Sequence, residues 1–195
     1  MKKYPLYLIL LLLVGCSSYG KLKIINKTDH LLYFKISFLS KRTVNPHQSV
    51  LISLKSGKNY LFNQSEKKYD LYLEGETFLM YNGLEPTTNT KITVTSDKTT
   101  KIYANPNMAG IKIINNSNDI IRDVGFEKIY PDTITEKEIL TDEIAPESEW
   151  FKQIPYSCES DSFDIRFSYV KDENDTINTK VLNLKLDQQF LLEIR

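Results

Sequence analysis

The chain has few of the residues that usually support a covalent framework or a metal site. Its 195 residues include two histidines, two cysteines and one tryptophan. With only Cys16 and Cys158 available, and Cys16 assigned below to the N-terminal segment, no intramolecular disulfide is expected. His30 and His47 lack the i, i+4 helical spacing or the cysteine partner of a zinc site. Stability must therefore come from hydrophobic cores, and no metal or other cofactor is expected.

Signatures of catalysis are also missing. There is no Gly-rich phosphate loop and no Gly-x-Ser-x-Gly nucleophile elbow. Cys158 has neutral and acidic neighbours, so nothing nearby in the sequence lowers its thiol pKa, and an inert, half-buried thiol is expected. Carboxylates are numerous, but their number alone does not place a pair at glycosidase separation. The sequence thus predicts a protein that is not an enzyme.

Long hydrophobic runs are confined to the N-terminus. Lys2 and Lys3 precede an apolar run from Leu6 to Val14, which ends at Gly15-Cys16 and the polar Ser17. The run is shorter than the roughly 20 residues of a membrane-spanning helix and has the length of a signal-peptide core. Residues 1–15 are therefore predicted to be a signal peptide that is removed.

The motif Leu13-Val14-Gly15-Cys16 resembles the lipobox of bacterial lipoproteins, in which the cysteine is diacylated before the signal peptide is cut away. The resemblance implies that Cys16 is lipidated and holds the protein at a membrane of the cell envelope. Because residue 17 is serine and not aspartate, it also favours the outer membrane of a double-membrane bacterium, with single-membrane bacteria left open. The alternative is an ordinary secretion signal followed by an incidental cysteine.

The chain as a whole carries no net charge, but its halves differ. Residues 17–110 hold 13 Lys and Arg against 7 Asp and Glu, a net charge of +6, whereas residues 111–195 hold 10 against 18, a net charge of −8. The basic half could lie on anionic head groups or attract the acidic half, or its lysines could simply be solvated on strand faces. Neutrality, the acidic second half and export disfavour nucleic-acid binding.

Comparison of the halves reveals a weak duplication. Lys23-Ile24-Ile25-Asn26 recurs 89 residues later as Lys112-Ile113-Ile114-Asn115, and Thr90-Lys91-Ile92 recurs at the same offset as Thr179-Lys180-Val181. Between them, 46–49 corresponds in order to 146–149, and 69–71 to 163–165. The matching segments occur in the same order in both halves, which predicts two copies of one fold.

The apolar residues alternate with a period of 2, which is typical of strands with one buried face. The pattern occurs in five runs: Leu32, Phe34, Ile36, Phe38; Val50, Ile52, Leu54; Phe163, Ile165, Phe167, Tyr169; Leu182, Leu184, Leu186; and Phe190, Leu192, Ile194. We therefore expect an all-β chain with two tandem antiparallel β-sandwich domains, similar in general pattern to immunoglobulin-like modules but without their Cys-Trp-Cys signature. The predicted organisation is a lipidated Cys16 with a tether at 16–20, domain 1 at 21–105, and domain 2 at 111–195, joined near Asn105–Gly110.

The most specialised surface is expected in the second half. The connection from Tyr130 to Ala145 is rich in acidic residues and includes the capping-box pattern Thr135–Glu138, which favours a helical turn there. Its alternative role is a solvated spacer. The candidate interaction residues are Glu136, Glu138, Asp142, Glu143, Trp150 and Phe151. The expected function is a non-catalytic module that binds an unknown protein or glycan partner; the alternative is an assembly subunit inside the envelope.

Overall fold

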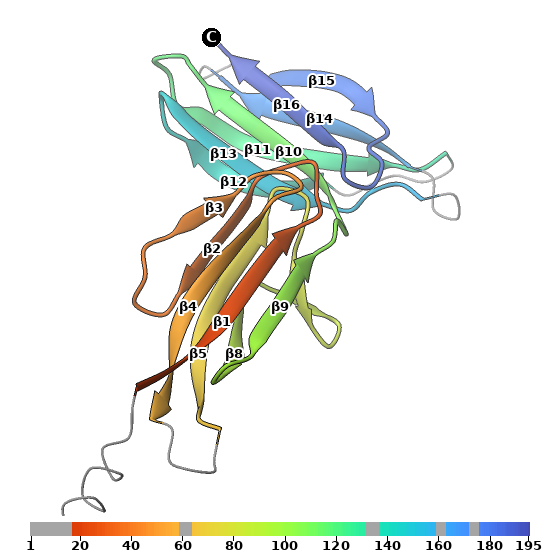
Figure 1. Cartoon of the computed structure of the whole chain (residues 1–195). Helices are drawn as coiled ribbons and strands as arrows, with labels where there is room; N and C mark the ends of the chain where they lie inside the picture. The colour runs from red at the N-terminus through yellow and green to blue at the C-terminus, as the bar shows by residue number, and fades with distance from the viewer. Residues whose placement is uncertain (1–16, 59–63, 132–136, 159–162, 172–175) are drawn as a thin grey trace, which may run out of the picture. The chain divides into compact units, whose positions relative to one another are not determined.

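The structure, a computed structural model, is all-β in the part of the chain that it describes, which is residues 17–58, 64–131, 137–158, 163–171 and 176–195 (Figure 1). Within those ranges, no helix has the length and apolar character needed to cross a bilayer. The chain forms two compact units. Unit 1 runs to Lys27 and takes in Leu31–Glu74 and Met80–Ala104, whereas unit 2 takes in Asn105–Arg195 and two short segments of the first half, Thr28–His30 and Gly75–Leu79.

Unit 1 contains a three-stranded sheet in the order β4-β1-β9, a four-stranded sheet in the order β3-β2-β5-β8, and the hairpin β6-β7. Its strands are β1 (Ser17–Asn26), β2 (Leu32–Ile36), β3 (Arg42–Val44), β4 (Ser49–Lys58), β5 (Glu66–Gly75), β6 (Met80–Asn82), β7 (Glu85–Thr87), β8 (Asn89–Thr95) and β9 (Thr99–Ala104). β1 is antiparallel to β4 and parallel to β9.

Unit 2 repeats this arrangement with sheets in the orders β13-β10-β16 and β12-β11-β14-β15. Its strands are β10 (Ala109–Asn115), β11 (Ile121–Ile129), β12 (Lys137–Ile144), β13 (Ser148–Ile154), β14 (Asp164–Val170), β15 (Thr176–Leu182) and β16 (Gln189–Ile194). β10 is antiparallel to β13 and parallel to β16, as β1 is to its two neighbours. The prediction of two tandem β-sandwiches is confirmed, with one parallel strand pair in each.

Unusual backbone angles recur at matching places in the two units. His47 and Glu147 adopt positive φ values of 56° and 51° in the turns before β4 and β13, and Asp97 and Asp187 adopt 60° and 63° in the turns before β9 and β16. Such angles are uncommon for residues other than glycine. Their recurrence shows that the duplication extends to the turn conformations.

The repeated asparagine at the end of β1 and β10 has a structural reason. The Nδ2 of Asn26 donates to the carbonyl oxygens of Val44 and Asn45 at 3.1 and 3.2 Å. In unit 2, the Nδ2 of Asn115 donates to the equivalent carbonyls of Ile144 and Ala145, at 3.3 and 3.1 Å. Both asparagines are fully buried. Each one satisfies backbone acceptors where a buried carbonyl would otherwise lack a partner.

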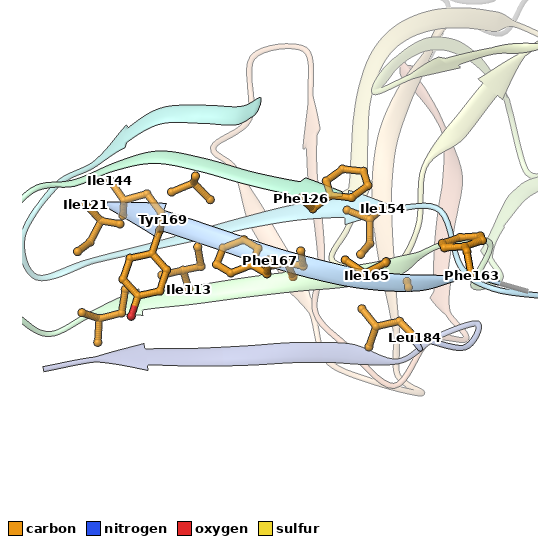
Figure 2. Packing of buried hydrophobic residues seen from close by; sticks show 14 residues of the cluster. Ile113, Ile121, Phe126, Ile144, Ile154, Phe163, Ile165, Phe167, Tyr169 and Leu184 are labelled. Carbon is orange, nitrogen blue, oxygen red and sulfur yellow. The ribbon is translucent and has the colours of Figure 1, made fainter. Parts of the chain in front are cut away.

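The core of each unit lies between its two sheets. In unit 2, Ile113 from β10 lies near Ile165 and Phe167 from β14 (Figure 2), and all three are fully buried in one cluster. The Phe167 ring lies 6.2 Å from that of Phe190, measured between centroids. Burying each large apolar side chain stabilises the fold by about 1.5–3 kcal/mol, so no disulfide is needed to close the domain.

Several local predictions were wrong. The predicted tether at residues 17–20 is the start of β1, because Ser18 and Gly20 are buried and pair with β4. Gly110, predicted in the linker, lies within β10. Phe38 is 76% exposed beyond the end of β2, and Leu186 lies exposed in a turn, so the alternating pattern overran both strands.

Candidate functional site

The predicted aromatic pair does not form one exposed patch. Trp150 and Phe151 are neighbours in β13, so their side chains point to opposite faces of the sheet. Trp150 lies opposite Ile113 and packs against the core of unit 2, whereas Phe151 lies opposite Lys112 on the outer face and is half-buried. Trp150 is therefore mainly a core residue.

The acidic connection before Pro146 was predicted as a loop, but it contains strand β12, which pairs with β11. Glu138, Asp142 and Glu143 lie in β12 and are exposed, while Glu136 and the first residue of the expected helical turn lie outside the described residues. Asp142 and Glu143 point to opposite sides of the strand because they are adjacent in sequence. The acidic residues therefore belong to a sheet edge and do not make a single acidic loop.

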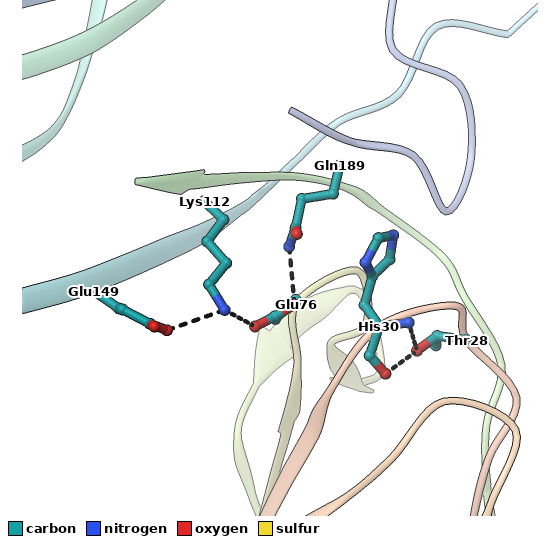
Figure 3. Close-up of polar contacts among 6 residues, drawn as sticks. All are labelled: Thr28, His30, Glu76, Lys112, Glu149 and Gln189. Carbon is teal, nitrogen blue, oxygen red and sulfur yellow. Dashed lines mark hydrogen bonds and ion pairs between the residues drawn. The ribbon is translucent and has the colours of Figure 1, made fainter. Parts of the chain in front are cut away.

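The structure does bring together a polar cluster in unit 2 that the sequence did not indicate. Glu76 is only 3% exposed, and its Oε1 lies 3.2 Å from the Nζ of Lys112 (Figure 3). Lys112 also reaches the Oε2 of Glu149 at 3.0 Å, and the Nε2 of Gln189 donates to the Oε2 of Glu76 at 3.0 Å. A buried carboxylate is tolerated when it is paired and hydrogen-bonded in this way.

The segment Gly75–Leu79 brings Glu76 to this cluster. The Nε2 of Gln153 donates to the carbonyl of Gly75 at 2.5 Å, and the amides of Asn107 and Met108 donate to the carbonyl of Thr77 at 3.2 and 3.1 Å. These bonds attach the segment to β13 and to the residues just before β10. The close approach needs a residue without a side chain, because a Cβ on Gly110 would lie 2.6 Å from the carbonyl oxygen of Glu76.

A second group of contacts surrounds Asp187. Its Oδ2 accepts from the amide of Asp29 at 2.9 Å, and its Oδ1 accepts from the hydroxyl of Thr77. The backbone oxygen of Asp187 lies 2.8 Å from the Nε2 of His30. His30 is thus a loop residue, as predicted. Its contact with Asp187 links the segment Thr28–His30 to the turn before β16 within unit 2.

The charges of Glu76 and Glu149 change the titration of Lys112. Burial alone lowers the pKa of the Lys112 ammonium, but the hydrogen bonds and charges of Glu149 and Glu76 outweigh it, so the pKa is raised above its ordinary value. Because the pKa is higher in the folded state, protonated Lys112 stabilises the fold. This stabilisation is fully present when the pH is below the pKa of lysine in the unfolded chain, about 10.4, and it is lost as the pH rises through the folded-state pKa.

We expect Glu76→Gln to reduce this contribution. The free energy of unfolding should differ most between the native chain and Glu76→Gln near pH 9, and the difference should shrink at higher pH as Lys112 loses its proton. Urea unfolding followed by the fluorescence of Trp150, the one tryptophan of the chain, reports on unit 2. Glu147→Gln, at an exposed position, is the control. A difference that stays constant from pH 9 to 12 would contradict the role given to Lys112.

Unit 2 also has an open hollow at one end, with a volume of about 360 Å³, lined by Ile129, Tyr130, Pro131, Phe163 and Asp164. The rings of Tyr130 and Phe163 lie 5.5 Å apart between centroids and are tilted by 53°. The Nζ of Lys128 lies 5.0 Å from the Phe163 centroid. Aromatic walls beside a carboxylate suit an apolar or sugar-like group with a polar substituent.

Neither this hollow nor the polar cluster supplies a metal site. Among the residues that the structure describes, no three His, Cys, Asp or Glu side chains are grouped to hold an ion. His47 lies in the turn before β4, and Cys158 is half-buried after β13, consistent with the predicted placement of both.

Comparison with known proteins gives no functional assignment. No family model matches the chain, and no curated protein sequence matches it. The TIE protein of Bacillus anthracis has a structure similar over 90% of this chain, with 12% identity and a TM-score of 0.33; the chain spans only 33% of that protein's length. The major pilin protein T-13 of Streptococcus pyogenes is similar over 92% of this chain and 97% of its own, with 9% identity and a TM-score of 0.27.

Proposed function

We propose that the chain is an exported bacterial lipoprotein that is anchored to the cell envelope, preferably to the outer membrane, through Cys16. In this proposal its mature part is a non-catalytic interaction module. The observation that carries the proposal is the lipobox-like motif Leu13-Val14-Gly15-Cys16, which follows two lysines and a short apolar run. β1 begins at Ser17, the residue directly after Cys16. A diacylated cysteine would therefore hold a folded sandwich at the bilayer with no intervening linker.

The hollow of unit 2 supports the interaction part of the proposal. Tyr130 and Phe163 offer aromatic surface, and Asp164 offers a hydrogen-bond acceptor, beside the end of β11 and the start of β14. Such surfaces bind protein side chains or glycans through large contact areas and a few polar contacts. The partner in this proposal is a protein or a glycan.

The alternative function is an assembly subunit inside the envelope, favoured by the opposite net charges of the two halves, +6 and −8. Protease treatment of intact cells separates the two functions. Cleavage without leakage of a periplasmic marker would favour surface contact, whereas protection that is lost on lysis would favour internal assembly.

Cys16→Ser is expected to abolish lipidation and to release the chain from membranes. Several acyl chains on one residue hold a protein at a bilayer because each buried CH₂ contributes roughly 0.8 kcal/mol. The measurement is incorporation of radiolabelled palmitate, together with fractionation of membranes washed in high salt. Cys158→Ser is the matched control and should keep both label and membrane association. Label incorporation that is unchanged in Cys16→Ser would refute the anchor.

A further inference from the structure

The outer face of the sheet β4-β1-β9 gathers positive charge from three separate parts of the sequence. In β1, Leu22 and Ile24 are fully buried, so Lys21 and Lys23 point to the opposite face. The strand register places Lys55 opposite Tyr19 and Lys101 opposite Lys23, on that same outer face. We call the surface formed by Lys21, Lys23, Lys55 and Lys101 the lysine face.

The lysine face has no compensating acid within its strands. None of the described residues of β1, β4 and β9 is Asp or Glu, and the turn before β9 adds Asp97 and Lys98, which carry opposite charges. The outer face of the other sheet of unit 1 differs, since Asp70 of β5 lies directly opposite Lys91 of β8. The lysine face therefore differs from the other sheet in having no acidic residue among its strands.

Unit 2 keeps one of these lysines and lacks two of them. Lys112 corresponds to Lys23, but Gly110 and Leu191 occupy the positions of β10 and β16 that correspond to Lys21 and Lys101. It also has Glu149 and Glu193 on this face, at positions equivalent to Ser49 and Tyr103. The same architecture can thus carry acidic residues on this face.

Apolar and aromatic side chains are interspersed with the lysines. Tyr19, Leu51 and Tyr103 are 49%, 55% and 51% exposed. In the strand register Tyr19 lies opposite Lys55 and Leu51 lies opposite Lys23, while Tyr103 is two residues after Lys101 in β9 and so lies on the same face. Tyrosine and lysine both combine an apolar body with a polar end, which suits the boundary between lipid head groups and acyl chains.

The spacing of the lysines along the chain from Cys16 determines how unit 1 must be oriented for all four to interact with the membrane surface. A strand rises about 3.3 Å per residue, so Tyr19 lies roughly 10 Å and Lys23 roughly 23 Å along β1 from residue 16. Surface potentials decay over a Debye length of about 8 Å in physiological salt. All four lysines would therefore lie within the surface potential only when β1 runs parallel to the membrane plane.

We propose that the lysine face lies flat on anionic phospholipid head groups, with Tyr19, Leu51 and Tyr103 at the interface. This inference rests on the proposed anchoring through Cys16, which brings the face to the bilayer. The contact is a second, electrostatic attachment that the acyl chains alone would not supply.

The test uses residues 17–195 without lipid, so that the face is measured apart from the anchor. The protein should sediment with vesicles containing phosphatidylglycerol and not with vesicles of phosphatidylcholine alone, and binding should weaken steeply with added salt. Replacing Lys21, Lys23, Lys55 and Lys101 together with glutamine should weaken binding about 600-fold, since each of the four lysines near an anionic surface contributes roughly a fivefold factor. Thermal melts check that the variant folds.

The matched control removes the same charge from elsewhere in unit 1, with glutamine at Lys35, Lys41, Lys68 and Lys91. This variant should bind nearly as well as the native chain. Equal loss in both variants, or binding that does not depend on phosphatidylglycerol, would overturn the proposal. Face-dependent binding to heparin without binding to vesicles would also overturn it and indicate an acidic polymer as the partner.

A second measurement reports on contact directly. Tyr103→Trp in a Trp150→Phe background places the only tryptophan on the lysine face, and its emission should shift to shorter wavelength on anionic vesicles. An unshifted emission at saturating lipid would contradict the flat orientation. Acylation of Cys16 is measured separately by palmitate labelling, so loss of the lysine-face contact and loss of the anchor give different results.

Discussion

Replacing Asn115 with alanine is expected to lower the free energy of unfolding of unit 2 by about 3–5 kcal/mol. The side chain is fully buried, and its Nδ2 donates to the carbonyls of Asp119, Ile144 and Ala145. Its Oδ1 accepts from both the amide and the hydroxyl of Ser117, at 3.1 and 2.7 Å. Alanine would leave several buried polar groups without partners, and each costs about 1–3 kcal/mol.

Urea unfolding followed by Trp150 fluorescence measures this loss, because Trp150 packs against the core of unit 2. Asn118→Ala is the matched control, since Asn118 is exposed in the same loop and should change stability by less than about 0.5 kcal/mol. If the two variants unfold at the same urea concentration, the role assigned to Asn115 as the bridge between β10 and the end of β12 is wrong.

Gly110→Val is expected to destabilise unit 2 by about 3 kcal/mol, because the new side chain would overlap the backbone of Glu76. The obstacle is a carbonyl oxygen and not the end of a flexible side chain, so relief requires movement of the segment Gly75–Leu79. That movement would strain the ion pair of Lys112 with Glu76 and the bonds of Asn107 and Met108 to Thr77.

Lys21→Val is the control, since Lys21 occupies the equivalent position in β1 and its side chain is exposed. It should leave the urea midpoint nearly unchanged. Hydrogen exchange gives a second readout, in which the amides of Asn107 and Met108 should exchange faster in Gly110→Val than in the native chain. Unchanged exchange together with unchanged stability would contradict the close packing of this segment.

The strand-level fold could be predicted because each strand has one buried face. Leu32, Phe34 and Ile36 alternate with polar residues, and all three are buried in β2. The pattern failed at Phe38 and Leu186, since apolar residues beyond the end of a strand continue the alternation without any partner to pack against. A strand ends where its hydrogen bonding to neighbouring strands ends, and the pattern of one strand's own residues carries no information about its neighbours.

The polar cluster around Glu76 and the lysine face could not be predicted, because each combines residues that are far apart in the sequence. Glu76 and Lys112 are 36 residues apart, and their pairing depends on a segment of the first half that packs in unit 2. The lysine face combines residues of β1, β4 and β9, and its sequence signal is only the lack of Asp and Glu in those three strands. The acidic residues around β12 are close in sequence, but the alternation of side chains along a strand separates Asp142 from Glu143.

The position of β1 between two partners has a mechanical consequence. If a membrane anchor at Cys16 were pulled, the tension would act along β1, which is hydrogen-bonded to β4 on one side and to β9 on the other. Lengthwise tension loads both ladders in shear, so many bonds must fail together, whereas a strand peeled from an edge loses them one after another. A sandwich held by such an anchor through a central strand would therefore resist this tension better than one held through an edge strand.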